Sequence, residues 1–376
     1  MRELVGLNKE REAWIDNVKM TAMLFVILGH TWRVIHCPLP FELGHFILSF
    51  NMALFVIMTG YTSVKALERI KDFHSLLKYV LKITKRVIVP SIVTTMAVGV
   101  LMMAFKYILI GEFSFLKFGA KILFVLVFCV AFYIRNKKNG AYLFDALCVL
   151  SIPIALKLNM FWFFNMIWAV CITAAIAVYI HKKYHAGGGI FLLYILAFVI
   201  SNVINYAHDK TSDFIHFFFI GFVFSKYNIL NSLLSVWVAL VLLSIGIILS
   251  FLMDSSYMNF WDNHFVQFLR NGTLIYYILR ILASTMICIH FLIVTKMYSG
   301  EYSSYSYWGA QTLSLYMVHA IIVTLFYHLP FQYSISGLSY LVYAIPMTII
   351  LLGVSMIIIK ILSKFDITNA YCLGNM

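Results

Sequence analysis

The first candidate for chemistry is a histidine in line with charged residues near the start of the chain. His30 follows Lys19 by eleven residues. At 100° per residue, eleven helical residues end about 20° past three full turns, so the two side chains share one helix face about 16 Å apart along the axis. Asp16 and Arg33 extend the same stripe at either end. An imidazole exchanges a proton near neutral pH, so His30 is a candidate general base toward a hydroxyl group.

The composition indicates that transmembrane helices position these residues. Of 376 residues, 62% are hydrophobic and 11% are charged, whereas a soluble domain has about 45–50% apolar and about 25% charged residues. This excludes a soluble enzyme, a disordered chain, a coiled coil and a nucleic-acid-binding module. We therefore expect an all-α fold, a polytopic transmembrane helix bundle that forms a single domain over residues 1–376.

Apolar segments recur along the whole chain. A spanning helix needs about 20 apolar residues, and several of the segments are shorter, so we expect about 10–12 spans. The first is interpreted as a helix and not as a removed signal peptide, because no small-residue cleavage site follows it. The segments are 18–36, 43–64, 87–110, 119–134, 141–157, 161–180, 189–207, 213–225, 232–252, 273–296, 309–329 and 338–362.

The distribution of cations predicts the orientation. The chain has 28 Lys and Arg against 15 Asp and Glu, a net charge of +13. If the N-terminus is cytoplasmic, alternating spans place most of these cations inside, which is typical of membrane proteins. This predicts a multi-pass protein of the bacterial cytoplasmic membrane with both termini inside. Residues 65–86 are predicted to form a basic amphipathic helix on the inner membrane face, and residues 253–272 the longest outside loop.

Other ionisable residues within the apolar segments are costly to bury, so each is a functional candidate. For any single one, a structural role at a hydrated helix end or in a hydrogen-bonded core is the favoured interpretation. They are Lys106, near a helix end; Asp145, His216 and Arg280, expected at hydrated helix ends; His290, expected as a core histidine; and His319. The six cysteines lack CxxC spacing and the twelve histidines lack HExxH spacing, so we expect neither a disulfide framework nor a metal site.

Residues 14–30 resemble the first helix of the acyltransferase-3 family of membrane proteins. The shared pattern is an aspartate, a cation, ten residues and then a histidine, and Asp16, Lys19 and His30 fit it. The usual cation of this pattern is arginine. Lysine keeps the charge but replaces a bidentate donor with a point charge.

Four further stretches resemble the same family in the same order. Residues 52–61 are similar to its second-helix motif, with Thr59 in place of serine, and residues 82–90 are similar to its basic pair followed by proline. Residues 160–164 resemble its Trp-Phe motif, and residues 309–319 its Ser-x-Tyr-x-x-His pattern. Together these motifs extend over about residues 14–325. The chain resembles the short, stand-alone branch that acts on polysaccharide or lipid-linked sugars.

The resemblance implies an O-acyltransferase, usually an O-acetyltransferase, that takes the acyl group from cytosolic acyl-CoA and gives it to a hydroxyl of an extracytoplasmic or lipid-linked glycan. It also implies a donor site in which Lys82, Lys85 and Arg86 neutralise the phosphates of CoA. The same cations suit anionic lipid headgroups or an orientation signal. Whether the acyl group also rests covalently on the protein stays open.

The acyl transfer that the resemblance implies suggests roles for the remaining candidate residues. Asp16 would fix Lys19 at the donor end, and His319 would be a partner of the base or a hydrogen-bond donor to the developing oxyanion. The flat rings of Trp162 and Phe163 suit packing against a sugar, or an interfacial aromatic belt. Arg33 would hold an anionic group of the acceptor, or a phospholipid phosphate.

Two other classes of membrane protein fit the same composition. A polysaccharide exporter, flippase or secondary transporter also has many spans and buried charges, although the two related halves that many transporters show are not evident here. A lipid-linked glycan polymerase or ligase would place key residues in a large outside loop such as 253–272. Neither class explains the pattern of Lys19 and His30.

Overall fold

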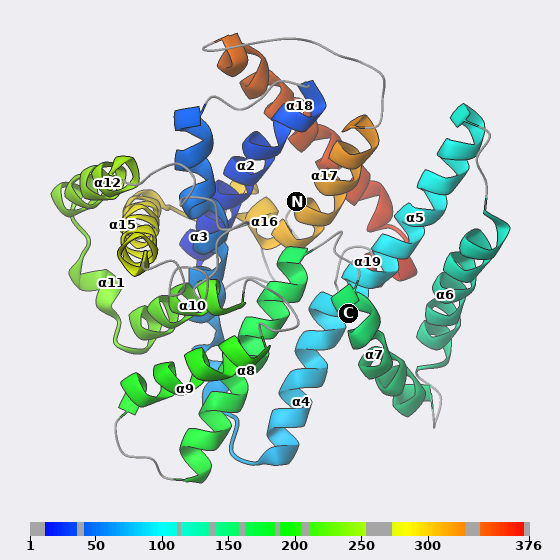
Figure 1. Ribbon diagram of the computed structural model, residues 1–376, viewed down its shortest axis with the longest axis horizontal. Coiled ribbons are helices and arrows are strands. Elements are labelled where there is room, and N and C mark those ends of the chain that lie inside the picture. The colour runs from blue at the N-terminus through cyan, green and yellow to red at the C-terminus, as the bar shows by residue number, and fades with distance from the viewer. Residues whose placement is uncertain are drawn as a thin grey trace.

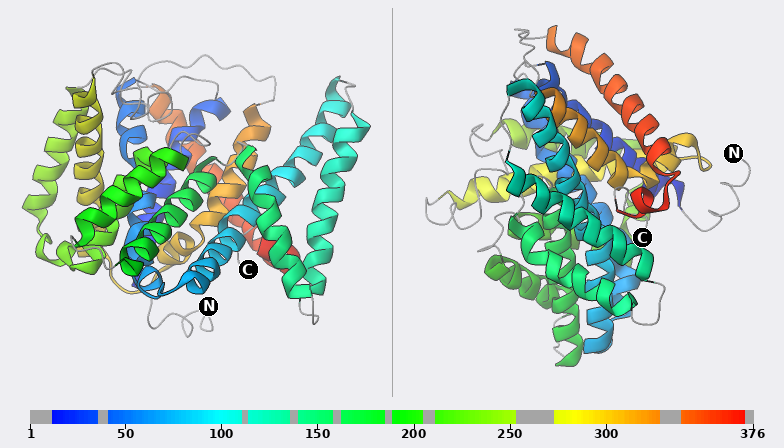
Figure 2. Two further views of the ribbon diagram at one scale, coloured as in Figure 1. Left: turned by 60° about the horizontal axis from the view of Figure 1, so that its bottom comes forward. Right: turned by 90° about the vertical axis from the view of Figure 1, so that its right-hand side faces the viewer.

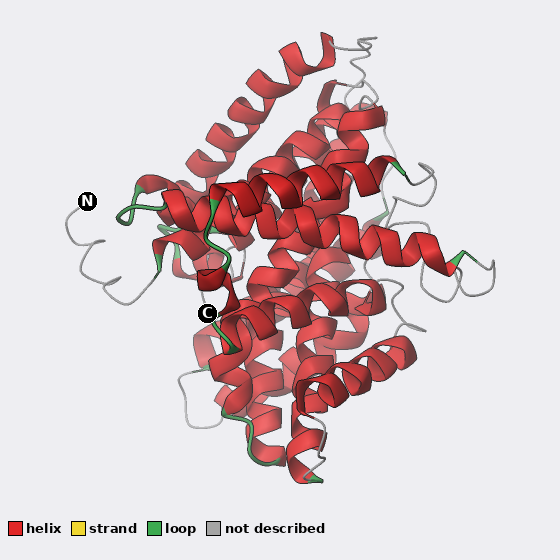
Figure 3. Cartoon of the chain, turned by 90° about the vertical axis from the view of Figure 1, so that its left-hand side faces the viewer, coloured by secondary structure: helices red, strands yellow, loops and turns green. Residues whose placement is uncertain are grey.

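The fold is entirely helical within the residues that the computed structural model describes (Figure 3). These are residues 12–35, 41–110, 114–135, 140–157, 162–184, 189–204, 211–252, 273–327 and 339–371. No strand occurs in these ranges, which confirms the predicted all-α transmembrane fold. The predicted outside loop, 253–272, lies outside the described residues.

Within the described residues, each of the twelve apolar segments is helical, and the segment 309–329 is broken in two (Figure 1). The long helices are α2 (Ala13–Ile35), α3 (Phe41–Glu68), α5 (Val89–Ile110), α6 (Phe115–Ile134), α7 (Gly140–Lys157), α8 (Trp162–Lys183), α9 (Gly189–Ile204), α10 (Thr211–Lys226), α12 (Val236–Phe251), α15 (Leu274–Tyr298), α17 (Thr312–Tyr327) and α18 (Ser339–Leu362). Shorter helices are α4 (Phe73–Ile83), η1 (Thr84–Ile88), α11 (Ile229–Ser232), α16 (Ser304–Ala310) and α19 (Asp366–Tyr371).

Fewer helices are long and apolar enough to span a bilayer than the segment count suggests. Within the described ranges there are six candidate spans, or seven if the bent pair α16–α17 forms one. The helices α9, α10 and α12 have 16 residues each, about 24 Å of length, which is short for a hydrocarbon core of about 30 Å. α2 has 23 residues, about 35 Å of length, but it is not among the six candidate spans.

The amphipathic helix predicted over 65–86 is shorter than expected. α4 has buried Leu76 and Tyr79 beside exposed Lys78 and Lys82, but it does not extend back to residue 65. α3 ends at Glu68, and α4 begins at Phe73 after a capping box in which Asp72 accepts a hydrogen bond from the Ser75 amide at 2.7 Å. These hydrogen bonds hold the pKa of the Asp72 carboxyl below its usual value. From Phe73 the helix continues through the π-helix η1 into α5, and Phe73–Ala104 is a candidate span of 32 residues. The capping residues break the helix where periodicity alone suggested continuity.

The core of the bundle lies where α2 and α3 cross, with α10, α15, α16, α17 and α18 packed around them. Gly60 of α3 and Gly221 of α10 allow these two helices to approach closely. A Cβ on Gly60 would lie only 1.9 Å from the Phe218 carbonyl oxygen, and a Cβ on Gly221 only 1.9 Å from the Ile57 carbonyl oxygen. Small residues permit such contact between membrane helices. α6 and α12 lie at opposite edges (Figure 2), where many apolar side chains are exposed, as expected of lipid-facing helices.

Candidate active site

The histidines singled out in the first and last motifs contact each other. His30 of α2 and His319 of α17 are 289 residues apart, yet His30 Nδ1 lies 3.1 Å from His319 Nε2. Their rings are nearly parallel, with 5.3 Å between centroids. His319 is fully buried, whereas His30 is only partly buried. The pair therefore has one sequestered member and one that is partly exposed.

Hydrogen bonding assigns the proton positions in this pair. His319 Nδ1 lies 2.9 Å from the Leu315 carbonyl oxygen, and because a carbonyl oxygen only accepts, Nδ1 carries the proton. In a neutral ring His319 Nε2 is then an acceptor, so His30 Nδ1 donates to it. This leaves the lone pair of His30 on Nε2. A base oriented by a second group in this way is the general arrangement of nucleophile activation in acyl transfer.

Aromatic side chains support the buried histidine. Tyr316 lies edge-on to His319, with 5.3 Å between ring centroids, and its own ring packs against Phe163 and Phe164. Phe163 is 5% exposed and also contacts Phe55. Phe163 therefore packs against Tyr316 inside the bundle, and its ring is not exposed for contact with a sugar.

Charged residues at the start of α2 form a local ion pair. Lys19 Nζ lies 3.4 Å from Asp16 Oδ1, and the Asp16 side chain is fully buried while Lys19 is 22% exposed. Lys19 therefore keeps a partly accessible ammonium, held by a carboxylate from one helical turn earlier. This is the contact expected of opposite charges three residues apart on one helix.

The broken pair α16–α17 brings His319 to α2. The two helices meet at an angle of 77°, and the short α16 packs against α2. Asn17 accepts a hydrogen bond from Ser306 at 2.8 Å and donates one to Ser299 at 2.9 Å. The hydroxyls of Thr21 and Tyr305 lie 3.0 Å apart. Polar contacts along one side of α2 therefore fix the bend from which α17 begins.

Gly309 is the closest point of this contact, because a Cβ there would lie 1.8 Å from the Asp16 carbonyl oxygen. We expect Gly309→Ala to push α16 away from α2 and to cost about 1–3 kcal/mol of stability. It should also lower any activity that depends on His319, because α17 carries that residue. Gly300→Ala is the control, since nothing lies within 4 Å of a Cβ there. Melting temperature and activity that stay normal in Gly309→Ala would contradict the tight α2–α16 contact.

The proposed donor cations lie on and beside the π-helix η1. Lys85 forms an ion pair with Asp145 of α7, so Asp145 has a charged partner and is not simply hydrated as expected. Lys82 and Arg86 are exposed. η1 is joined to the middle of α8 by Trp168, whose indole N–H donates to Thr84 Oγ at 2.9 Å. Of the three cations, Lys82 and Arg86 are thus the more accessible to an anionic ligand.

The remaining predicted site residues are placed less completely. Trp162 is partly buried at the start of α8, where its ring contacts Phe163 and Phe214. Arg33 lies on α2, and its side chain is outside the described residues, as is that of Lys106. The structure therefore brings together His30 with His319, and Asp16 with Lys19, and leaves Arg33 unplaced.

A second buried polar cluster lies between α9, α10 and α15. Arg280 and Asp213 are both fully buried, with 3.6 Å between Arg280 Nη2 and Asp213 Oδ1. His216 Nδ1 lies 2.6 Å from the Tyr194 hydroxyl, and its Nε2 lies 2.7 Å from the Tyr277 hydroxyl. The expectation of hydrated helix ends for Arg280 and His216 is wrong. The sequence feature that could have predicted this cluster is Asp213, because an acidic residue in an apolar segment requires a partner of opposite charge.

The fold defines a multi-pass membrane protein, and its histidine pair consists of one imidazole oriented by a second, buried one. The sequence matches the family model described as an acyltransferase domain, acyltransferase 3, over residues 12–360. The chain therefore belongs to the acyltransferase-3 family and is a membrane acyltransferase. No curated protein and no solved structure matches it.

Proposed function

We propose that this acyltransferase moves an acetyl group from cytosolic acetyl-CoA to a hydroxyl of an extracytoplasmic or lipid-linked glycan. The observation that supports it is the hydrogen bond of 3.1 Å between His30 and His319. A sugar hydroxyl is a weak nucleophile at neutral pH, so its acylation needs a base, and one imidazole held by another supplies it.

In the proposed step, the acceptor hydroxyl attacks the thioester carbonyl while its proton moves to His30 Nε2. The new C–O bond forms, the C–S bond breaks, and the CoA sulfur leaves and takes up the proton. His319 keeps the His30 ring in the required tautomer through the bond to Nδ1, because its own Nδ1 proton is committed to Leu315. Removal of this partner would let the His30 ring rotate and change tautomer.

The donor side of the proposal uses Lys19 and the accessible cations Lys82 and Arg86, which suit the phosphates of CoA. We expect Arg86→Gln to raise the KM for acetyl-CoA about tenfold with a small change in kcat, since an exposed charged contact to substrate is lost. Lys364→Gln, an exposed cation after α18, is the control. An unchanged KM in Arg86→Gln would remove Arg86 from the donor site.

The function itself is tested on the surface glycan of the host. We expect mass spectrometry to show acetate lost from the glycan of a strain without the gene, with the amount of glycan unchanged. The purified protein should transfer the ¹⁴C-acetyl group from ¹⁴C-acetyl-CoA to the de-O-acetylated glycan. Loss of the glycan itself would instead indicate an exporter or a polymerase, and transfer of a longer acyl chain in preference to acetyl would correct the donor.

A further inference from the structure

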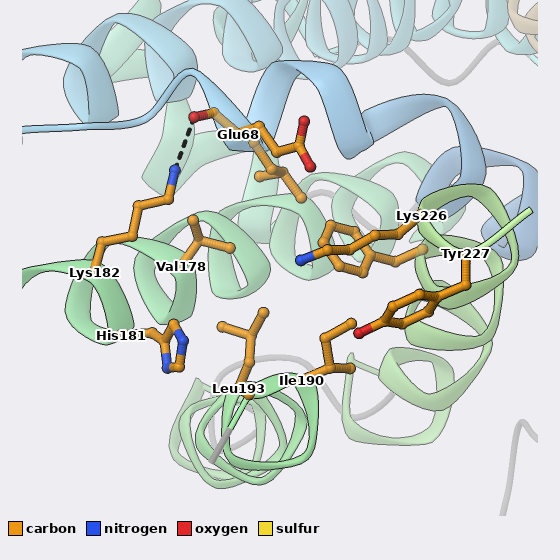
Figure 4. A pocket seen from close by; sticks show the side chains of 11 residues that line it. Glu68, Val178, His181, Lys182, Ile190, Leu193, Lys226 and Tyr227 are labelled. Carbon is orange, nitrogen blue, oxygen red and sulfur yellow. Dashed lines mark hydrogen bonds between the residues drawn. The ribbon is translucent and has the colours of Figure 1, made fainter. Parts of the chain in front are cut away.

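A cavity of about 140 Å³ lies where α3, α8, α9 and α10 meet (Figure 4). A Cβ on Gly29, next to His30, would lie 3.3 Å from Ile47 of α3. Glu68, which lines the cavity, follows Ile47 by 21 residues in the same helix, about 32 Å along its axis. The cavity is therefore separate from the site of acyl transfer.

Nitrogen atoms suited to an anion converge on this cavity. Lys182 and Lys226 extend toward it from α8 and from the end of α10 (Figure 4). Lys182 Nζ donates to the carbonyl oxygens of Glu68 and Ile70 at 2.8 and 2.9 Å. This leaves it one further N–H, because an ammonium has three.

Lys226 and His181 have donor or acceptor capacity that the protein does not use. Among the described residues, the Lys226 ammonium has no hydrogen-bond or carboxylate partner, and it lies 5.8 Å from the centroid of the Phe222 ring. His181 Nδ1 is a buried atom, and no residue that the structure describes forms a hydrogen bond with it. Buried polar atoms are normally satisfied, so His181 Nδ1 points to a polar ligand. Lys226 is exposed, and its ammonium at the cavity edge is accessible to the same ligand.

The rest of the lining indicates an amphipathic ligand. Leu67, Val178, Ile190, Leu193 and Phe222 supply apolar surface. The neighbouring α9 exposes Leu192, Ile195 and Val199 by 37%, 39% and 53%, so its outer surface faces lipid. The cavity thus lies beside a lipid-facing helix, at helix ends rich in lysine, where phospholipid headgroups meet a membrane protein.

We propose that this cavity binds the phosphate of an anionic membrane phospholipid. The two lysines and Glu68 give the lining a net charge of +1 with His181 neutral, which a single phosphodiester neutralises. A zwitterionic headgroup would leave that charge unbalanced. The lipid acyl chains would lie along α9, and the headgroup would join the ends of α3, α8 and α10.

Native mass spectrometry of the purified full-length protein tests this proposal. Phosphatidylglycerol, phosphatidylcholine and inorganic phosphate are added separately, and bound molecules are counted. We expect the wild type to retain phosphatidylglycerol over phosphatidylcholine. Lys226→Gln should weaken that retention about tenfold, and Lys226→Arg should preserve it. Glu68→Gln should strengthen it, because it removes the one carboxylate at the cavity.

Lys183→Gln is the matched control, because Lys183 neighbours Lys182 but lies over the rings of Tyr179 and Tyr184 and does not line the cavity. It should retain the lipid as the wild type does. Equal retention of phosphatidylglycerol by Lys226→Gln and the wild type would overturn the proposal. So would release of the lipid by millimolar inorganic phosphate, which would make this a site for a free anion.

Discussion

Replacing His30 with alanine is expected to lower the rate of acyl transfer by about 10²–10⁴-fold, the usual contribution of a positioned general base. His30 Nδ1 donates to His319, and the assigned tautomer leaves Nε2 as the nitrogen that can accept a proton from the acceptor hydroxyl. Alanine removes both functions. The rate is measured as label transferred from ¹⁴C-acetyl-CoA by protein in membranes.

Folding has to be separated from chemistry in this variant. Because His30 is only partly buried, His30→Ala should insert and purify in the same amount as the wild type, and its melting temperature should change little. His74→Ala, which removes an exposed histidine on α4, should transfer acyl groups normally. If His30→Ala folds and remains active, His30 is not the base.

Removing one member of the buried ion pair should have the largest effect on stability. Asp213→Ala leaves the Arg280 guanidinium without its carboxylate in a fully buried position. We expect a loss of about 3–5 kcal/mol in the free energy of unfolding, because an uncompensated buried charge is very costly. Thermal melting of the detergent-solubilised protein measures the loss.

The double variant Asp213→Ala/Arg280→Met should regain most of that stability, because replacing a buried ion pair with apolar groups is often neutral. Asp366→Ala, which removes an exposed aspartate on α19, should melt as the wild type does. A double variant less stable than Asp213→Ala would show that Arg280 contributes through contacts other than the ion pair.

The helices were the most predictable part of this fold. All twelve apolar segments are helical because apolar runs of this length bury their backbone polar groups only as helices in lipid. Breaks were less predictable. The capping box at Asp72 interrupts a periodic stretch, and α16–α17 bends by 77° where Gly309 meets the backbone of Asp16. Such breaks depend on a few local contacts that hydropathy does not record.

In the candidate site, the individual residues were predictable from the sequence, but their contacts between distant helices were not. His30 was identified from its helical spacing to Lys19, His319 as an ionisable residue in an apolar segment, and motif resemblance supported both. The Asp16–Lys19 pair also followed from helical spacing, since both members lie on one turn. Contacts between distant helices had no sequence signal of their own. The pairing of Lys85 with Asp145 and that of Asp213 with Arg280 follow from how helices pack. Opposite charges in separate apolar segments indicate only that partners exist.

The packing of Phe163 also shows the limit of a motif. An aromatic pair beside a predicted outer face suits a sugar, but in the structure Phe163 lies inside the bundle against Tyr316. Its position in the motif is explained by the support it gives to the helix that carries His319. Aromatic type and spacing do not distinguish a binding surface from a core contact.

The most direct test of the account is a double-mutant cycle on the histidine pair. Acyl-transfer rates are compared for the wild type, His30→Ala, His319→Ala and the double variant, all shown to be folded. If the two histidines act as one unit, His319→Ala alone should be strongly impaired and the double variant should be no slower than His30→Ala. Independent, multiplicative losses, or normal activity in His319→Ala, would contradict the proposed pair.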